Sequence, residues 1–278
     1  MKKYVIIVLA AVMAACTNER VNEEAEAKRV TFRMAGDMAF MPNTRASLQD
    51  VNMTDLWVFD YVDGTCVQSV HQASTDADFG APSLLLTYGT HHVYFVASRG
   101  GSPTVNESGH TITWDTPRDT FWEDYEVDVS SSSSASHTVT MHRAATRLRV
   151  NIKDEVPAEC AQLSLTPATW YAGLDYVSGL AVGGAAKEFT VTVPASYAGT
   201  SNQLSMTVYG LSDTDEWTSD VSLRALADDG EELGHVTIVA APFKRNRATE
   251  YSGNLFNASG SIGVSLDDTW EQSYVGEW

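Results

Sequence analysis

Cysteine is scarce in this chain, and its scarcity excludes two kinds of small scaffold. The 278 residues include three cysteines, Cys16, Cys66 and Cys160. A disulfide framework or a structural zinc site needs closely spaced sets of Cys or His, which three widely separated thiols do not provide. We expect Cys66 and Cys160 to be small apolar residues in two different domains, and their pairing stays open.

Basic residues are also few. The chain has 18 Lys and Arg against 36 Asp and Glu, which gives a formal net charge of −18 at pH 7. Binding to a nucleic-acid backbone or to anionic lipid needs a basic patch, so this balance argues against both. Acidity of this kind is typical of an exported protein that is kept soluble by its charge.

The sequence also lacks the motifs of common enzyme classes. It contains no Gly-Xaa-Ser-Xaa-Gly, no phosphate-binding glycine loop and no His-Glu-Xaa-Xaa-His. The acidic clusters at residues 213–216 and 267–268 lack the spacing and the glycine bend of calcium loops. His91 and His92 are adjacent, and on a strand they would point to opposite faces, away from any shared metal. We therefore predict no catalytic residues, no cofactor and no metal site.

The N-terminus has the pattern of an export signal. Residues 1–3 carry two lysines, residues 4–15 are apolar, and Ala14-Ala15 precede Cys16. An apolar run this short is a secretory signal and not a membrane span. The small residues before Cys16 resemble the bacterial lipobox, in which the cysteine receives a lipid and the chain is cut before it. We predict a lipoprotein signal peptide over 1–15 and an acidic flexible tether over 16–28; a plain secretory signal with an incidental cysteine is the alternative.

From residue 29 onward, apolar and polar residues alternate, which is typical of strands with one buried face. The apolar members of these runs are Val30, Phe32 and Met34; Leu148, Val150 and Ile152; Phe189, Val191 and Val193; Leu204, Met206 and Val208; and Ile262, Val264 and Leu266. Residues 56–62 and 93–97 are apolar on both faces and predict central strands of packed sheets. Turn signals separate the runs, and no helix of three turns is predicted.

This pattern predicts an all-β fold of two tandem β-sandwich domains. Five serines at 130–134 are the first candidate for a linker. However, strand patterns at 137–141 and 145–152 flank Arg143, so we place the boundary there and interpret the serine run as a mobile loop. The domains would then be residues 29–143 and 144–278, each large enough for its own core.

Seven tryptophans raise the question of a sugar-stacking platform. In β-sandwiches such residues more often pack in the core or on a sheet face, and we favour that interpretation. The residues are Trp57, Trp114, Trp122, Trp170, Trp217, Trp270 and Trp278.

Several segments, in order along the chain, carry a family resemblance. They are the lipobox at 14–16, the strand at 30–34 with the loop at 43–46, LWVFDYVDG at 56–64, HVYFVA at 92–97, MHRAATRLRV at 141–150, and PFKRNRATEYSGNLF at 242–256. Together they resemble the fimbrillin-like proteins of Bacteroidales, which are subunits or anchors of type V pili.

The resemblance implies two transthyretin-like β-sandwich domains and assembly by donor-strand exchange. In the family, a lipoprotein precursor reaches the outer membrane, and an arginine-specific protease removes the first strand by cutting the loop after it. A strand from a neighbouring subunit then fills the groove. By position, the cut would fall between Arg45 and Ala46, and residues 29–40 would be removed. The donor would lie within residues 262–278, with Ile262, Val264, Leu266, Trp270 and Trp278 as its apolar residues.

The implied partners are other fimbrial subunits in a homo- or hetero-polymer, the outer membrane through a lipid on Cys16, and host or bacterial surface ligands in adhesion. Stalk, tip and anchor roles stay open, and an ordinary loop arginine is the alternative for Arg45. The second hypothesis is a surface lipoprotein that binds glycan or a host ligand through its sandwich loops without polymerising.

Overall fold

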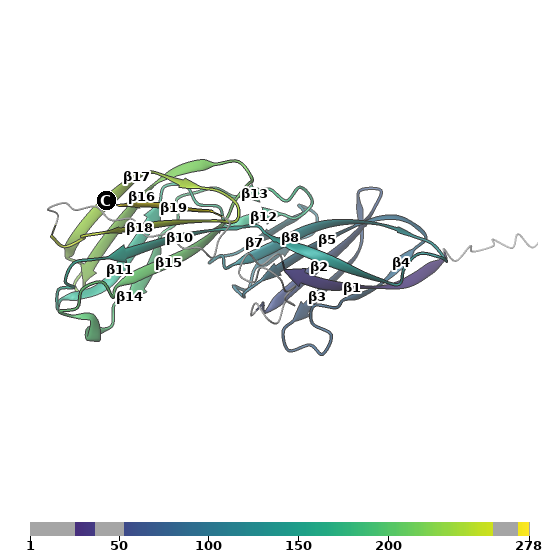
Figure 1. Ribbon diagram of the computed structural model, residues 1–278, viewed down its shortest axis with the longest axis horizontal. Coiled ribbons are helices and arrows are strands. Elements are labelled where there is room, and N and C mark those ends of the chain that lie inside the picture. The colour runs from purple at the N-terminus through teal and green to yellow at the C-terminus, as the bar shows by residue number, and fades with distance from the viewer. Residues whose placement is uncertain (1–25, 37–52, 258–271, 278) are drawn as a thin grey trace, which may run out of the picture.

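The computed structural model describes residues 26–36, 53–257 and 272–277, and it consists almost entirely of β-strands in two lobes (Figure 1). The all-β prediction is confirmed. The helical structure in the described residues is one 3-10 turn, η1 (Ala195–Tyr197). Within those residues, no helix is long and apolar enough to cross a membrane.

The N-terminal lobe is a seven-stranded sheet with the order β3-β2-β5-β8-β9-β1-β4. Its strands are β1 (Ala27–Gly36), β2 (Asp55–Val62), β3 (Thr65–Ala73), β4 (Ser83–Thr87), β5 (Gly89–Ser98), β8 (Thr120–Val129) and β9 (Ser136–Arg143). β8 and β9 pair only through Phe121–Arg143 and Trp122–His142, so the sheet turns a corner there. The part with β3, β2, β5 and β8 and the part with β9, β1 and β4 enclose one core between them.

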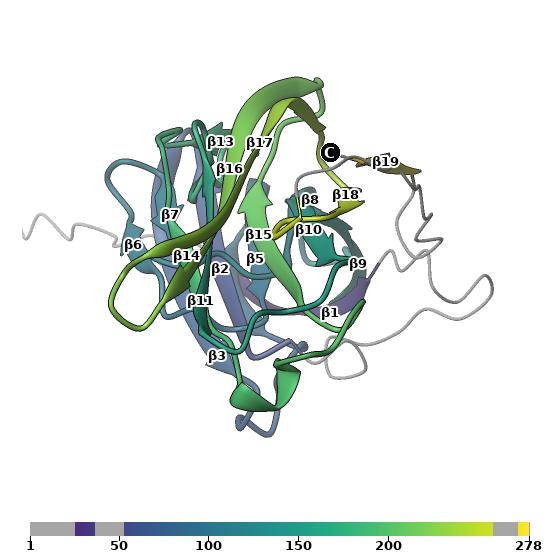
Figure 2. The ribbon, with the colours of Figure 1, turned by 90° about the vertical axis from the view of Figure 1, so that its left-hand side faces the viewer.

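The C-terminal lobe is a sandwich of two four-stranded sheets, with the orders β15-β10-β18-β19 and β14-β11-β16-β17 (Figure 2). Its strands are β10 (Ala145–Ile152), β11 (Cys160–Pro167), β14 (Phe189–Thr192), β15 (Ser205–Leu211), β16 (Trp217–Ala227), β17 (Glu232–Phe243), β18 (Arg247–Gly253) and β19 (Gln272–Glu277). Leu148, Val150 and Ile152 are buried as predicted. Val191 differs, with 40% of its surface exposed, because β14 is an edge strand.

A small third sheet draws strands from both halves of the chain. It has the order β13-β12-β7-β6, and its strands are β6 (Thr104–Asn106), β7 (Thr111–Thr113), β12 (Gly173–Asp175) and β13 (Ala181–Val182). Figure 1 shows β7, β12 and β13 between the two lobes. Their side chains form an aromatic-rich cluster with the outer faces of β2 and β5. This cluster explains why residues 56–62 and 93–97 are buried on both faces, which confirms the prediction of central strands.

The two lobes meet where β9 ends at Arg143 and β10 begins at Ala145. The pairing of β7 with β12 joins residues 111–113 to residues 173–175 across that point. The division at residue 143 stays a prediction, because these paired segments tie the two halves together. The serine run forms a hydrogen-bonded turn between β8 and β9, in which the amide of Ser133 donates to the carbonyl of Ser130.

Candidate strand-exchange site

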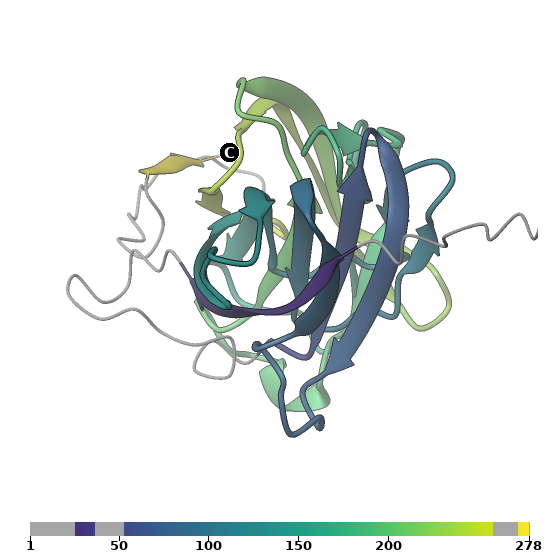
Figure 3. The same ribbon diagram turned by 90° about the vertical axis from the view of Figure 1, so that its right-hand side faces the viewer.

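β1 lies between two other strands and is the first described strand of the chain. Residues 27–31 pair with β4 in the antiparallel direction, and residues 31–36 pair with β9 in the parallel direction. The amides of Phe32 and Met34 donate to the carbonyls of Pro82 and Gly80, which continue the β4 side. Figure 3 shows β1, in purple, crossing the N-terminal lobe. Removing β1 would therefore leave two unpaired edges with a slot between them.

Alternate side chains of β1 complete the core of this lobe. Val30 and Phe32 are fully buried and Met34 is 6% exposed, while Arg33 points outward and is exposed. Burying three such side chains contributes about 5 to 9 kcal/mol in all. This amount approaches the whole folding stability of a typical domain, about 5 to 15 kcal/mol. β1 is thus both energetically important and peripheral in the sequence.

Phe32 occupies an aromatic pocket at the middle of β1. The centroid of its ring lies 5.4 Å from that of Phe95, 5.9 Å from that of Tyr125 and 5.8 Å from that of His137. The Tyr125 hydroxyl and His137 Nδ1 are 3.1 Å apart and hydrogen-bonded. Because His137 Nε2 lies 3.3 Å from the Ser134 carbonyl, this nitrogen is the donor and Nδ1 accepts from Tyr125. The hydrogen bonds hold both rings in place around Phe32.

Polar contacts fix the register at the start of β1. The Lys28 ammonium donates to the carbonyls of Ser130, Ser131 and Ser133 in the serine turn. The hydroxyls of Thr31 and Ser83 are 2.6 Å apart, between β1 and β4. The serine run thus has a role that composition alone does not indicate, because its backbone carbonyls accept hydrogen bonds from the Lys28 ammonium.

β19 lies within the predicted donor segment near the C-terminus. It pairs in the parallel direction with β18, from Arg247–Gln272 to Ser252–Glu277, and among the described strands it has no second partner. Figure 1 shows it beside β18, and Figure 2 shows it at the outer edge of the C-terminal lobe. Residues 272–277 belong to the predicted donor segment, so part of that segment pairs with its own chain here.

The other predicted site residues lie outside the described residues. They are the lipidation residue, the two residues of the cleavage site and the apolar residues of the donor: Cys16, Arg45, Ala46, Ile262, Val264, Leu266, Trp270 and Trp278. Their roles stay predictions. β4 was not predicted from the sequence, although it is the antiparallel partner of β1; Leu84 and Leu86 are buried, but Leu85 between them hides the alternation.

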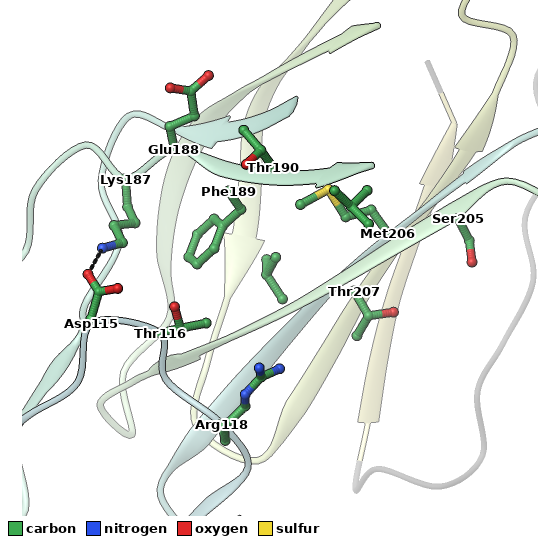
Figure 4. A pocket seen from close by; sticks show the side chains of 12 residues that line it. Asp115, Thr116, Arg118, Lys187, Glu188, Phe189, Thr190, Ser205, Met206 and Thr207 are labelled. Atoms are coloured by element: carbon green, nitrogen blue, oxygen red, sulfur yellow. Dashed lines mark hydrogen bonds and ion pairs between the residues drawn. The ribbon is translucent and has the colours of Figure 1, made fainter. Parts of the chain in front are cut away.

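A groove opens between two edge strands of the C-terminal lobe (Figure 4). It has a volume of about 480 Å³, and its sides include β14 and β15, with Phe189 and Met206 among its lining residues. At one end, the Lys187 ammonium lies 2.9 Å from the Asp115 carboxylate. Arg118 lines the groove nearby and is exposed. The groove thus combines charged and hydroxyl side chains with the largely buried Phe189 and Met206.

Among the described residues, His91 and the tryptophans pack within the fold and do not form a metal or sugar site. His91 is 1% exposed and its Nδ1 lies 2.7 Å from Asp60, while His92 points to the opposite face of β5 and its side chain is 44% exposed. Burial raises the pKa of the Asp60 carboxyl, and the hydrogen bond between Asp60 and His91 opposes this shift. No set of metal-binding side chains occurs among the described residues. The five tryptophans in that part of the chain are buried or half-buried, so they form no exposed sugar platform.

Solved structures with a similar fold include several proteins of Bacteroides. A candidate adhesin of Bacteroides ovatus has a TM-score of 0.54 and 9% identity, and the match covers 82% of this chain and 88% of that one. A candidate polysaccharide-binding protein of Bacteroides thetaiotaomicron has a TM-score of 0.53 and 7% identity, covering 75% and 80%. A candidate cell adhesion protein of Bacteroides ovatus has a TM-score of 0.50 and 13% identity, covering 90% and 98%.

These likenesses concern the fold, and they agree with the β-sandwich fold that the resemblance to fimbrillin-like proteins predicts. No curated protein matches the chain. Residues 103–277 match a family of unknown function, DUF6562. Because this match covers more than half of the 278 residues, the chain belongs to that family.

Proposed function

We propose that this protein is a structural subunit or anchor of a surface fimbria that supports adhesion and assembles by donor-strand exchange. The observation that carries the proposal is the position of β1, which is an interior strand of its sheet, between β9 and β4, and the first described strand of the chain. A strand in this position can be detached as a unit by one cut in residues 37–52. The fold likeness to candidate adhesins of Bacteroides supports the same function.

The slot left by β1 would need another strand. The edges of β4 and β9 would expose unpaired backbone groups, and the core would expose the surfaces that Val30, Phe32 and Met34 now cover. An extended segment with alternate apolar side chains satisfies both needs at once. Because donor and acceptor surfaces differ, repeated insertion is head-to-tail and builds a filament.

In this proposal the lipid on Cys16 tethers the precursor to the outer membrane. Cleavage between Arg45 and Ala46 would release the tether together with β1, whereas an anchor would keep both. The donor segment of residues 262–278, which includes β19, would detach from β18 and fill the slot of a neighbouring fimbrial subunit. Stalk, tip and anchor roles differ in which of these steps take place.

The test is limited digestion with an arginine-specific protease, followed by mass spectrometry and size-exclusion chromatography. We expect a cut after Arg45, a new N-terminus at Ala46 and the appearance of oligomers. Arg29 and Arg33 should be cut more slowly, because their backbone is paired within β1. The Arg45→Gln variant is the matched control and should stay monomeric. A protein that is cut after Arg45 and remains monomeric after β1 is displaced would contradict the polymerising role.

The groove between β14 and β15 favours the second candidate function, a surface protein that binds a glycan or a host ligand. Its lining includes Thr190 and Thr207, the exposed Arg118 and the apolar Phe189 and Met206. Hydroxyl, cationic and apolar groups together suit a polar ligand with an apolar face. Tight ligand binding by the uncut monomer, with no oligomers after cleavage, would favour this function over strand exchange.

A further inference from the structure

We infer that the strand that fills the β1 slot of this protein comes from a subunit with a different amino-acid sequence, and that this strand carries an aromatic side chain at its centre. The inference rests on the proposed strand exchange and names the partner of that site. It follows from the shape of the slot, which is known from the side chains of β1, and from the sequence of the chain's own candidate donor.

The slot is most demanding at its middle position. Phe32 is fully buried, and its ring contacts the rings of Phe95, Tyr125 and His137 at centroid distances of 5.4, 5.9 and 5.8 Å. Edge-to-face and offset contacts of this kind add to the burial of apolar area. Val30 and Met34 occupy the neighbouring inward positions. The matching donor therefore reads apolar, aromatic, apolar at alternate residues.

The chain's own donor segment lacks this pattern. Within residues 262–278, the only alternate triplet of large apolar side chains is Ile262, Val264 and Leu266. Its centre is valine, which has four fewer side-chain carbons than phenylalanine. A valine at the Phe32 position would leave a void between the three rings, and tightly packed interiors do not readily close such voids.

Other registers of the same segment are worse. Reversing the direction of the donor keeps Val264 at the centre, because the triplet is symmetric about it. A shift by two residues brings either Gly260 or Asp268 into an inward position. Trp270 is flanked at alternate positions by Asp268 and Gln272, so using its ring would bury a carboxylate or an amide. Tyr274 is flanked by Gln272 and Gly276, so using its ring would bury an amide at one inward position and leave the other without a side chain.

The expected preference is about 100-fold, since each buried methylene is worth about fourfold in an equilibrium constant and four carbons are lost, less some relaxation of the pocket. A self-donated strand would thus bind measurably, yet it would lose to a partner strand with a central aromatic residue. In a mixture of subunits, this difference in affinity favours a neighbour with a different sequence as the donor to the β1 slot.

The experiment uses the full chain, cut at Arg45, and measures the displacement of the β1 fragment by fluorescently labelled peptides. The peptides are residues 27–36, residues 260–268, and residues 260–268 with Val264→Phe. A fourth peptide with Ile262→Phe is the matched control, because it has the same added ring at a flanking position.

We expect the peptide of residues 27–36 and the Val264→Phe peptide to enter the slot, and the unmodified 260–268 peptide to bind about 100-fold more weakly than its Val264→Phe version. The Ile262→Phe peptide should gain much less. Equal affinity of the 260–268 peptide and its Val264→Phe version, within about threefold, would overturn the inference while leaving strand exchange intact. Failure of every peptide, residues 27–36 included, would overturn strand exchange itself.

Discussion

Arg143 forms a buried ion pair with Asp119 and a hydrogen bond with Asn246 in the C-terminal lobe, and replacing it should destabilise the protein strongly. Its Nε and Nη2 donate to the two carboxylate oxygens of Asp119 at 2.8 and 3.2 Å, and its Nη1 donates to Asn246 in the C-terminal lobe at 3.1 Å. The guanidinium also lies 4.9 Å from the ring centroid of Phe121. The side chains of Arg143 and Asp119 are 4% and 3% exposed. Arg143→Met would leave the Asp119 carboxylate buried, with Arg99 at 3.8 Å as its remaining cation.

The expected loss is about 3 to 5 kcal/mol, because removing one partner of a buried pair leaves the Asp119 charge compensated only by the longer contact with the half-exposed Arg99. The assay is urea unfolding followed by tryptophan fluorescence. Arg224→Met is the matched control, since Arg224 and Glu232 form a pair of similar length, 2.7 Å, with side chains 43% and 40% exposed. Breaking that exposed pair should cost no more than about 1 kcal/mol.

The double variant Arg143→Met with Asp119→Leu separates charge burial from lost packing. It should recover much of the stability, because it no longer buries an unpaired carboxylate. The reasoning would be refuted if Arg143→Met were no more destabilising than Arg224→Met, or if the double variant were less stable than Arg143→Met.

Two further predictions concern β1 and the buried pair of Asp60 and His91. Phe32→Ala should lower the free energy of unfolding by about 3 to 5 kcal/mol in the same urea assay, and Arg33→Ala, on the exposed face of the strand, should change it by less than about 0.5 kcal/mol; similar losses would mean that β1 does not pack as described. Burial raises the pKa of Asp60 above its ordinary value of 3.8, so the native protein keeps this proton to a higher pH than the unfolded chain does. Its contribution to stability is therefore full below pH 3.8 and is lost as the pH rises through the native pKa, and the difference in unfolding free energy between the wild type and Asp60→Asn should shift in that direction. A difference that stays constant across this range would contradict the assignment.

The sequence predicts the individual strands well where the alternation is clean. Val30, Phe32 and Met34 alternate with exposed or half-buried residues, and the same holds for Leu204, Met206 and Val208. These patterns record which face of a strand is buried, and this face is a local property of the chain. The buried face does not identify the neighbouring strand, so the pairing of β1 with both β4 and β9 could not be derived from alternation.

The third sheet was not predictable for a related reason. β7 and β12 have three residues each, too few to show a period, and their partners are about sixty residues away in the sequence. The sequence nevertheless indicated that such a sheet exists, because residues 56–62 and 93–97 are apolar on both faces. A strand that is buried on both faces requires a second layer, but its sequence does not say which segment provides that layer.

This second layer bears directly on strand exchange. If β1 leaves, the sheet of β3, β2, β5 and β8 loses part of its inner cover, yet its outer face stays packed. Trp57, Phe59 and Tyr94 face that outer side, and the ring of Phe59 stacks on that of Tyr176 with centroids 3.9 Å apart. Tyr176 belongs to the C-terminal half of the chain and does not depend on β1. In the proposed acceptor state, this framework would hold β5 and β8, and with them Phe95 and Tyr125, close to the positions that an incoming aromatic side chain needs.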